Sequence, residues 1–399
     1  MVKINHYIIA PSPWRDDGLK FRRHRIAEYL LKHPDTKSII WLYPISVHSL
    51  KNGKKYILNK YKLDIHTSSS EIQEIGLLDL KGFLKHSKKG LIFEKRMMQK
   101  IQEPKNDEGS ILNYLWFTHP AFSWLATDQL FNWDKVIYDC SDLWTSSFVK
   151  RNGILNKFET IRTQRIVSAE IDIINRADKI TATSDYLSNK INKSKNKEIL
   201  VIENGVEYEL FTKKDIEDNV LKEFEDIPKP RLGFIGGLKH KIDFELLYKI
   251  AKKEPNFSIV LAGPVTENKP DGLKELLALA NVFYLGTIDP VKVPQFMRCL
   301  DIGLLPYKEI EYNKAISPLK LFEYIASGLP AVGCGLPMTL KYEKSGIYTH
   351  CIGNEELIIN ECKKMLIKDS DQMKKLRELE AKNHSWEQKL EFILKYVQS

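Results

Sequence analysis

One segment in the second half of the chain has the features of an anion site at the start of a helix. Ser317 can cap a helix, and Pro318 suits the first helical position. The unpaired N–H groups of that turn could hold a phosphate or diphosphate, and Lys320 adds a positive charge. Glu323 follows in an otherwise apolar helix, where a carboxylate needs hydroxyl or N–H donors. Ribose hydroxyls would serve; the alternative is a buried Glu323 bonded to neighbouring backbone.

A second group of chemically capable side chains opens the first expected helix. Arg22, Arg23 and Arg25 stand around His24, and Arg15 is a weaker member of the group. Facing a cleft, this cluster could bind a phosphate or carboxylate of an acceptor. The alternative is a solvated face, because at about 100° per residue consecutive side chains cannot all point one way.

Short apolar runs alternate with helical patterns in both halves, which favours parallel sheets with helices on both faces. In the first half we expect strands over 7–10, 38–43, 113–117, 135–138, 179–182 and 198–202, and helices over 21–32, 157–176 and 184–193. After Pro228 and Pro230 the pattern restarts. There we expect strands over 231–235, 257–262, 282–285, 300–306 and 331–333, and helices over 244–253 and 318–327. The Lys-rich region 51–110 is interpreted as loops and short helices.

The segment from Ser317 to Pro330 resembles the nucleotide-sugar signature of the GT-B glycosyltransferases, specifically the large retaining group called family 4. The run Ser317–Pro330 is the most specific element. Residues 202–206 are similar to the family's interdomain Asn-Gly-Val turn, and 234–237 to the strand and loop that open its nucleotide domain. Residues 384–386 are similar to a C-terminal His-Ser-Trp that precedes a crossing helix. Asn313, together with residues 317–320 and 138–139, is more closely similar to the teichuronic-acid-biosynthesis type of glycosyltransferase.

The resemblance implies an α/β fold of the GT-B type, in which two doubly wound Rossmann-like domains face a central cleft. It implies a basic, acceptor-side domain over 1–205 and a nucleotide-sugar domain over 206–380. A helix over 381–399 would return to the first domain.

The resemblance also implies how the donor is held. In this fold the diphosphate charge is normally compensated without a metal, by helix N-termini and cations. Glu323 would hold the ribose, and the loop after Gly286 would contact the base. The residues assigned to the nucleotide sugar are Gly236, Gly237, Lys239, Lys241, Gly286, Ile288, Ser317, Pro318, Leu319, Lys320 and Glu323. Ala315 departs from the family, which often has a glutamate there.

Three residues of the first half are assigned to catalysis. His119 would approach the donor sugar, unless it packs under the aromatic cluster 116–124. Asp139 and Asp142 are the candidate carboxylates. In an inverting enzyme one of them could deprotonate the acceptor hydroxyl; in a retaining enzyme they could bind sugar hydroxyls. Asp142 has the alternative of capping the segment that follows it.

The charge of the chain is uneven. Residues 1–200 carry 33 Lys and Arg against 22 Asp and Glu, whereas residues 201–399 carry 28 against 30. A basic half could meet an anionic lipid surface or a polyanionic glycan, or it could be a solvated face. Nucleic acid is disfavoured, because no helix-turn-helix, zinc-finger or RNP-type pattern occurs.

The sequence also predicts a location. No run of about 18 apolar residues and no signal peptide is evident. Five cysteines without a CxxC pair indicate reduced thiols rather than disulfides or a zinc site. We expect a cytoplasmic protein, peripheral at the inner face of the membrane.

The combined prediction is a metal-independent glycosyltransferase without a cofactor. Its donor would be a nucleotide-diphosphate sugar, with UDP the family expectation, and its acceptor a polyprenyl-linked or polymeric cell-surface glycan. The alternative is a non-catalytic or epimerase-like nucleotide-sugar-binding protein. An epimerase would need several acid/base groups crowded at the sugar.

Overall fold

The computed structural model describes residues 2–14, 20–46, 66–67, 72–79, 86–102, 111–146, 154–193, 197–266 and 269–399. The chain divides into two compact units. The N-terminal unit comprises residues 1–202 and 390–399, and the C-terminal unit comprises residues 203–389. Each unit is described by itself below.

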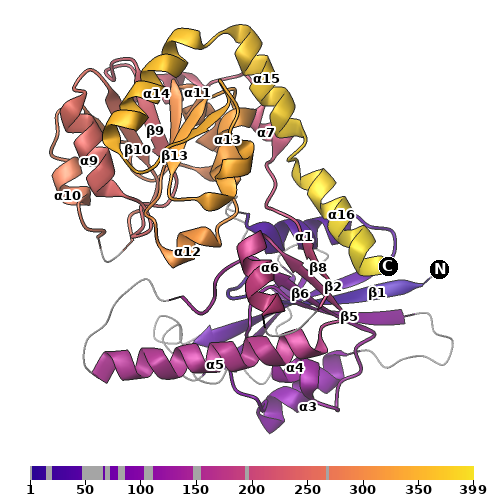
Figure 1. The fold of residues 1–399 in the computed structure, drawn as a ribbon. Coiled ribbons are helices and arrows are strands. Elements are labelled where there is room, and N and C mark those ends of the chain that lie inside the picture. Colours follow the sequence, from indigo (N-terminus) through magenta and orange to yellow (C-terminus); the bar gives the residue numbers. More distant parts are fainter. Residues whose placement is uncertain are drawn as a thin grey trace. The chain divides into compact units, whose positions relative to one another are not determined.

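The N-terminal unit is built on an eight-stranded sheet of described residues (Figure 1). Its order is β3-β4-β2-β1-β5-β6-β7-β8, and all neighbours are parallel except β3 and β4. The strands are β1 (Lys3–Ile9), β2 (Thr36–Ser46), β3 (His66–Thr67), β4 (Ile72–Asp79), β5 (Ile111–Phe117), β6 (Lys135–Cys140), β7 (Lys179–Ala182) and β8 (Ile199–Val201). The strand order reverses between β1 and β5, which makes their carboxyl ends the expected ligand-binding edge.

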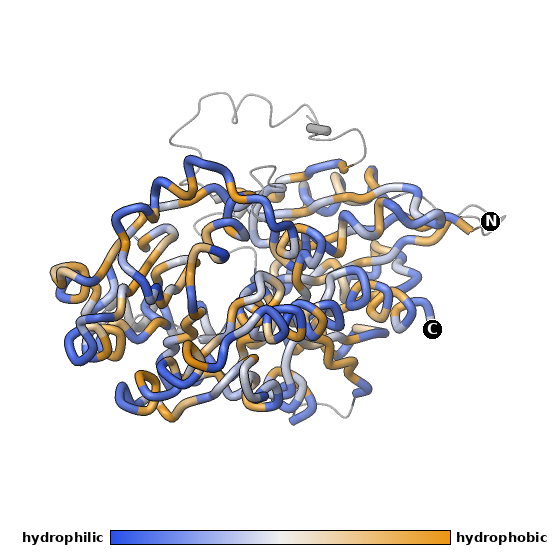
Figure 2. Tube along the Cα trace, turned by 90° about the horizontal axis from the view of Figure 1, so that it is seen from above, coloured by the Kyte–Doolittle hydropathy of each residue, from blue (hydrophilic) through white to orange (hydrophobic). Residues whose placement is uncertain are grey.

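Helices connect and cover these strands. They are α1 (Arg22–Leu31), α3 (Ile92–Ile101), α4 (Trp124–Thr127), α5 (Ile154–Arg176) and α6 (Asp185–Asn192). Hydrophilic and hydrophobic residues alternate along the helical coils in Figure 2, as expected for helices that bury one face. Ser184 caps α6 by accepting a hydrogen bond from the Leu187 N–H.

A polar network lies inside this sheet, between β1 and β5. The Trp116 Nε1–H donates to Nδ1 of His6 at 3.1 Å, and the Asn5 amide donates to the Asn113 side-chain oxygen at 3.2 Å. His6 is 1% exposed. Burial is the main cause that lowers the pKa of His6 to about 3, so the ring is neutral and able to accept this hydrogen bond.

The C-terminal unit is built on a six-stranded, fully parallel sheet of described residues. Its order is β11-β10-β9-β12-β13-β14. The strands are β9 (Arg231–Ile235), β10 (Ser258–Ala262), β11 (Val282–Tyr284), β12 (Ile302–Pro306), β13 (Ala331–Cys334) and β14 (Tyr348–His350). Here the strand order reverses between β9 and β12.

The helices of this unit connect its strands, and most of them contribute apolar side chains to one buried core. They are α7 (Tyr208–Phe211), α8 (Asp218–Glu223), α9 (Phe244–Lys253), α10 (Leu273–Leu276), η4 (Pro290–Lys292), α11 (Val293–Arg298), α12 (Glu311–Lys314), α13 (Leu319–Ala326), η5 (Pro337–Tyr342), α14 (Glu355–Lys368), α15 (Asp371–Lys382) and α16 (Trp386–Gln398). By the division above, α16 begins in this unit, and residues from Leu390 onward belong to the N-terminal unit.

The expected alternation of strands and helices is present, in two parallel sheets. The strands at 179–182 and 231–235 and the helix at 244–253 have the expected bounds. The interpretation of 51–110 as loops and short helices was wrong at β4, which pairs with β2 along its whole length. Within the described ranges, no helix combines the length and the apolar character needed to cross a bilayer.

Candidate functional site

The site of the C-terminal unit lies at the carboxyl ends of β9, β10 and β11, where three glycines come together. The Gly236 N–H donates to the Ala262 carbonyl, and the Gly263 N–H donates to the Gly286 carbonyl, each at 2.7 Å. A Cβ on Gly263 would lie 2.2 Å from the Gly236 carbonyl oxygen, and its φ of +131° is one that glycine adopts readily. Main chain rather than side chain therefore forms this edge of the sheet.

Lys320 reaches this glycine edge from α13. Its Cε lies where a side chain on Gly236 would be, 2.2 Å from the position of a Cβ, and its Nζ is 5.9 Å from the centre of the Phe234 ring. Two segments more than 80 residues apart are thus in contact. A side chain at 236 would displace the end of the lysine from its present position.

Glu323 lies one helical turn after Lys320, and the two side chains form an ion pair. The Lys320 Nζ and Glu323 Oε2 atoms are 3.3 Å apart, and the side chains are 21% and 15% exposed. This confirms that Glu323 is largely buried, but its partner is Lys320 rather than neighbouring backbone. Both side chains remain partly exposed.

The residues that flank Glu323 hold α13 on the sheet. The Tyr324 hydroxyl lies 3.2 Å from the carbonyl oxygens of both Gly233 and Leu304, which belong to β9 and β12. Phe322 is fully buried and stacks on the His384 ring, with 4.1 Å between the ring centres. The position of Glu323 is therefore fixed from both sides.

The start of α13 differs from the expectation. The helix begins at Leu319 with Pro318 at the N-cap, and no side chain caps it. The Ser317 hydroxyl instead accepts a hydrogen bond from the Asn204 N–H at 2.9 Å. The prediction that Ser317 caps this helix was wrong, because a backbone donor from the Asn-Gly-Val segment occupies its oxygen.

The loop after β9 carries two further predicted cations. Lys241 lies over the rings of Tyr307 and Tyr312, 5.7 Å from each centre, and Lys239 lies beside Gly237. Burial and then the charge of Glu323 raise the pKa of Tyr307. Tyr307 therefore contacts Lys241 and is influenced by the charge of Glu323.

Two motifs of the sequence meet next to α13. The Val206 N–H donates to the His384 carbonyl, and the Trp386 N–H donates to the Val206 carbonyl. A Cβ on Gly205 would lie 2.8 Å from the Trp386 backbone, which explains the glycine of the Asn-Gly-Val turn. Burial is the main cause that lowers the pKa of His384 to about 4. The ring stacked on Phe322 is thus neutral at neutral pH.

In the N-terminal unit, His119 follows β5 at the edge where the strand order reverses. Its ring is 9% exposed and lies edge-on to Trp144, with 4.6 Å between the ring centres. Trp144 follows β6, the neighbour of β5, and its indole N–H is buried without a hydrogen-bond partner. The sequence interpretation missed Trp144, although an aromatic residue two positions after Asp142 was an available signal.

Asp139 and Arg22 form a buried ion pair in the same unit. Arg22 Nη2 lies 2.9 Å from Asp139 Oδ1, and the side chains are 4% and 1% exposed. The Arg22 Nε–H donates to both carboxylate oxygens, and the Thr181 hydroxyl donates to Oδ1 at 2.6 Å. These bonds occupy both oxygens of Asp139. They favour a structural function for the pair over the predicted catalytic and acceptor-binding ones.

The other predicted residues of this unit are distributed as helical geometry requires. Arg23 lies over the Phe21 ring and Arg25 pairs with Glu28 at 3.1 Å, both partly exposed on α1. The basic cluster is therefore divided between the buried face and the partly exposed face of α1. Asp142 is partly exposed in the loop after β6, whereas Arg15 lies outside the described residues.

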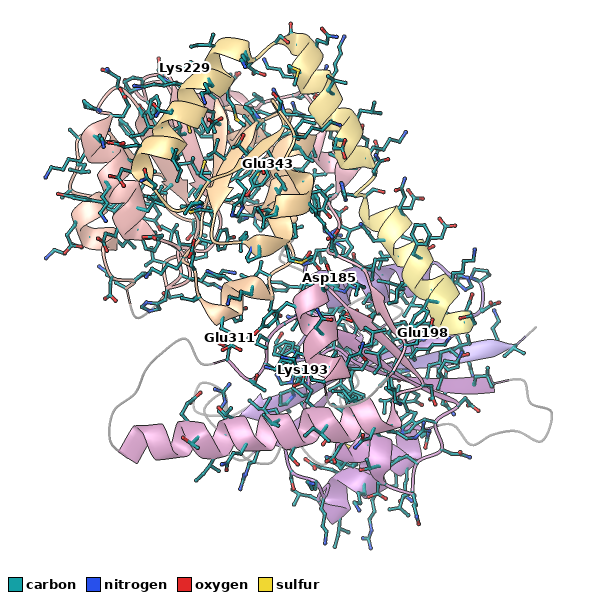
Figure 3. All side chains as sticks on the ribbon, in the orientation of Figure 1. Asp185, Lys193, Glu198, Lys229, Glu311 and Glu343 are labelled. Atoms are coloured by element: carbon teal, nitrogen blue, oxygen red, sulfur yellow. The ribbon has the colours of Figure 1, made fainter. Side chains whose placement is uncertain are left out.

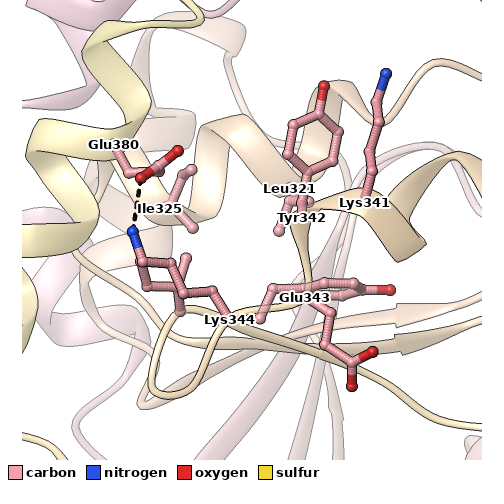
Figure 4. Close-up of a pocket in the computed structure, with 9 residues that line it drawn as sticks. Leu321, Ile325, Lys341, Tyr342, Glu343, Lys344 and Glu380 are labelled. Carbon is pink, nitrogen blue, oxygen red and sulfur yellow. Dashed lines mark hydrogen bonds and ion pairs between the residues drawn. The ribbon is translucent and has the colours of Figure 1, made fainter.

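A separate small pocket lies on another side of α13 (Figure 4). Its volume is about 100 Å³ and it is lined from α13, η5, β14 and α15, with an ion pair between Lys344 and Glu380 at 3.2 Å. Lys320 and Glu323 do not line it, so it is not the site built above. No group of three or more potential metal ligands occurs among the residues that the structure describes.

Comparisons with known proteins agree with a fold of two Rossmann-like units. A family model described as glycosyl transferases group 1 matches residues 229–372. The Bacillus subtilis (strain 168) protein TuaH, whose name describes a teichuronic acid biosynthesis glycosyltransferase, is 36% identical over 403 residues, covering 99% of this chain and 97% of that protein.

Two solved structures share the fold. Anabaena Alr3699/HepE in complex with UDP and glucose matches over all of both chains, with a TM-score of 0.66 and 13% identity. Sucrose-phosphate synthase from Thermosynechococcus elongatus matches over 99% of this chain and 98% of that one, with a TM-score of 0.69 and 13% identity. The fold is that of the GT-B enzymes. The chain belongs to the group 1 glycosyltransferases, and it is a glycosyltransferase.

Proposed function

We propose that this glycosyltransferase uses a UDP-sugar donor, which it holds at the glycine edge of the C-terminal unit. The observation that carries the proposal is the partly exposed Lys320–Glu323 pair at the start of α13, in contact with Gly236. A cation and a carboxylate one turn apart suit a nucleoside diphosphate, which presents negative phosphates beside ribose hydroxyl donors. The Anabaena protein of the same fold was solved with UDP and glucose, which supports the choice of nucleotide.

The chemistry follows from the charges. A diphosphate leaves more easily when preorganised positive groups stabilise it. Lys320 would serve from α13, and Lys239 and Lys241 from the loop after β9. The expectation of unpaired N–H groups in the first turn of α13 was wrong for Leu319 and Leu321, whose N–H groups donate to the carbonyls of Ser317 and Pro318. Glu323 would accept hydrogen bonds from the ribose, and the main chain from Gly286 to Ile288 would contact the base. We propose that these groups are sufficient without a metal ion or another cofactor.

The acceptor is proposed to be a polymeric or polyprenyl-linked cell-surface glycan. The relationship to TuaH supports teichuronic acid as the product class. His119 and Asp142 remain the proposed catalytic residues, and the Trp144 ring packs edge-on against His119. The excess of positive charge in residues 1–200 supports a cytoplasmic location at the anionic inner face of the membrane.

Transfer is favoured over epimerisation by the state of Asp139. An epimerase needs several acid/base groups at the sugar, and Arg22 and Thr181 already occupy this carboxylate. Whether the enzyme retains or inverts the anomeric configuration is measured by determining the anomer of the product formed from a UDP-sugar of known configuration.

The test is calorimetric titration of the purified protein with UDP, GDP and ADP, repeated on Glu323→Ala. Loss of the ribose hydrogen bonds is expected to cost about 1–3 kcal/mol, which weakens UDP binding about 5- to 150-fold. The matched control is Glu361→Ala, which removes the glutamate of another Lys–Glu pair three residues apart on α14. It should leave UDP affinity unchanged.

Each outcome bears on a separate part of the proposal. Equal UDP affinity of Glu323→Ala and the wild type would refute this ribose site. Binding of GDP or ADP in preference to UDP would refute the choice of base. Loss of transferase turnover in EDTA, restored by a divalent cation, would refute metal independence.

A further inference from the structure

Two segments far apart in sequence are joined next to the lysines that are predicted to bind the diphosphate. One is the loop after β9 that carries Lys239 and Lys241, and the other runs from Tyr307 through α12 to α13 (Figure 3 labels Glu311 at the start of α12). Ile242 forms an antiparallel bridge with Tyr307, and the Lys308 N–H donates to the Lys241 carbonyl at 3.0 Å. The relative position of the two segments therefore depends on a short stretch of contacts.

Asn313 adds a side-chain link to this stretch. It lies in α12 and is 0% exposed. Its Nδ2 donates to the carbonyl oxygens of Lys308 at 2.7 Å and of Lys241 at 3.0 Å. Since both partners are acceptors, the orientation of the amide is fixed, with the NH₂ toward the two carbonyls. One side chain thus ties the lysine loop to the segment that leads into α13.

The side-chain oxygen of Asn313, in contrast to its NH₂ group, has no hydrogen-bond partner. This oxygen, Oδ1, is buried. A buried unsatisfied acceptor carries a free-energy cost, which is set against the two hydrogen bonds that Nδ2 donates. The stabilising part of this side chain is therefore its NH₂ group, which makes the link.

We infer that Asn313 is a positioning residue for the donor diphosphate, acting through the main chain of Lys241. The inference rests on the proposed function, because it assumes that Lys239, Lys241 and Lys320 meet the phosphates. Without the amide, the loop after β9 keeps its backbone bonds to residues 306–308, but the Lys241 carbonyl loses its second hydrogen bond, the one that comes from α12. Binding of the diphosphate should then weaken, while binding of the nucleoside should not.

The chain offers a matched control for this inference. Asn281 directly precedes β11, at the amino end of that strand. It also donates its Nδ2 to two carbonyl oxygens, those of Ala251 at 3.0 Å and Phe257 at 2.9 Å. The variants Asn313→Ala and Asn281→Ala therefore remove the same bonding pattern at two places in one unit. Both should lower the melting temperature.

The experiment measures the affinities of both variants for UDP and for uridine by calorimetry. We expect Asn313→Ala to bind UDP at least about 10-fold more weakly with uridine affinity unchanged, and Asn281→Ala to keep both affinities. Asn313→Ser retains one donor and should fall between Asn313→Ala and the wild type. If Asn313→Ala does not fold, Asn313→Ser takes its place in the comparison with Asn281→Ala.

Several results would overturn the inference. Equal changes in Asn313→Ala and Asn281→Ala, or a parallel loss of UDP and uridine binding, would show general loosening of the unit. Failure of both Asn313 variants to fold would assign the residue to stability alone. If the wild type binds no uridine nucleotide, the proposed function itself fails; if it binds UDP and Asn313→Ala binds equally well, only this inference fails.

Discussion

The two units each contain an ion pair between residues predicted to be functional, and the pairs differ in burial. In the N-terminal unit the Arg22 and Asp139 side chains are 4% and 1% exposed, and a third group, Thr181, bonds the carboxylate. In the C-terminal unit the Lys320 and Glu323 side chains are 21% and 15% exposed and make a single contact at 3.3 Å. Residue type and charge are similar, but only the second pair leaves its groups open to a ligand.

The comparison separates two uses of charge. A fully buried pair must satisfy its hydrogen bonds internally, because removing one partner leaves an uncompensated charge in a medium of low dielectric constant. A partly exposed pair at a helix start contributes little to stability but can exchange its internal contact for a ligand. A chemically capable residue is therefore a good site candidate only where its partners leave it accessible.

The largest expected effect is on the buried pair. Asp139→Asn leaves Arg22 without a counter-charge and should lower the free energy of unfolding by about 3–5 kcal/mol, measured by urea denaturation. Glu28→Gln, which removes the carboxylate that pairs with both Lys20 and Arg25 at the surface, should change it by less than about 1 kcal/mol. An Asp139→Asn protein as stable as the wild type but without turnover would break the comparison and restore the catalytic assignment.

A second effect concerns pH and the buried His6. Its pKa in the folded protein, about 3, lies below the unfolded value of 6.5, so the unfolded chain binds more protons between these values. Stability should be highest above pH 6.5 and should fall as the pH is lowered, by about 2 kcal/mol at pH 5. Denaturation curves at several pH values should show this slope. His6→Gln keeps an acceptor for the Trp116 indole and should flatten the slope; an unchanged slope would assign it to other groups.

The smallest effect is expected on the exposed side of α1. Arg23→Ala and Arg25→Ala should each weaken binding to anionic vesicles by about 1 kcal/mol or less at low salt, and high salt should release the wild type. Co-sedimentation with vesicles measures both. Neither variant should alter the free energy of unfolding by more than about 1 kcal/mol. Binding that persists at high salt would point to inserted apolar side chains instead of charge.

The sequence predicted most strands and helices because their signals are local. Buried parallel strands are short apolar runs, and α9 has strong helical periodicity, so both were visible from neighbouring residues. The strand β4 was missed because it lies in a polar, Lys-rich region and is specified by its pairing with β2. Pairing between distant segments has no local signature.

The candidate site shows the same division. The spacing of Lys320 and Glu323 was visible as a helical pattern three residues apart. The contact of Lys320 with Gly236, and the hydrogen bond from the Asn204 N–H to Ser317, join residues that lie far apart in the chain. The error about Ser317 arose because a local rule for caps was applied where a distant donor occupies the hydroxyl.

The sequence by itself determined the alternation of elements, the family resemblance and the order of charges along α13, since each depends on residues within a few turns of one another. Only the tertiary structure decided which charges are available to a ligand. Arg22 and Asp139 neutralise each other because the chain brings α1 beside β6, across 117 positions of sequence. Accessibility depends on what packs around a group, and that is fixed by contacts between segments that the sequence alone does not place together.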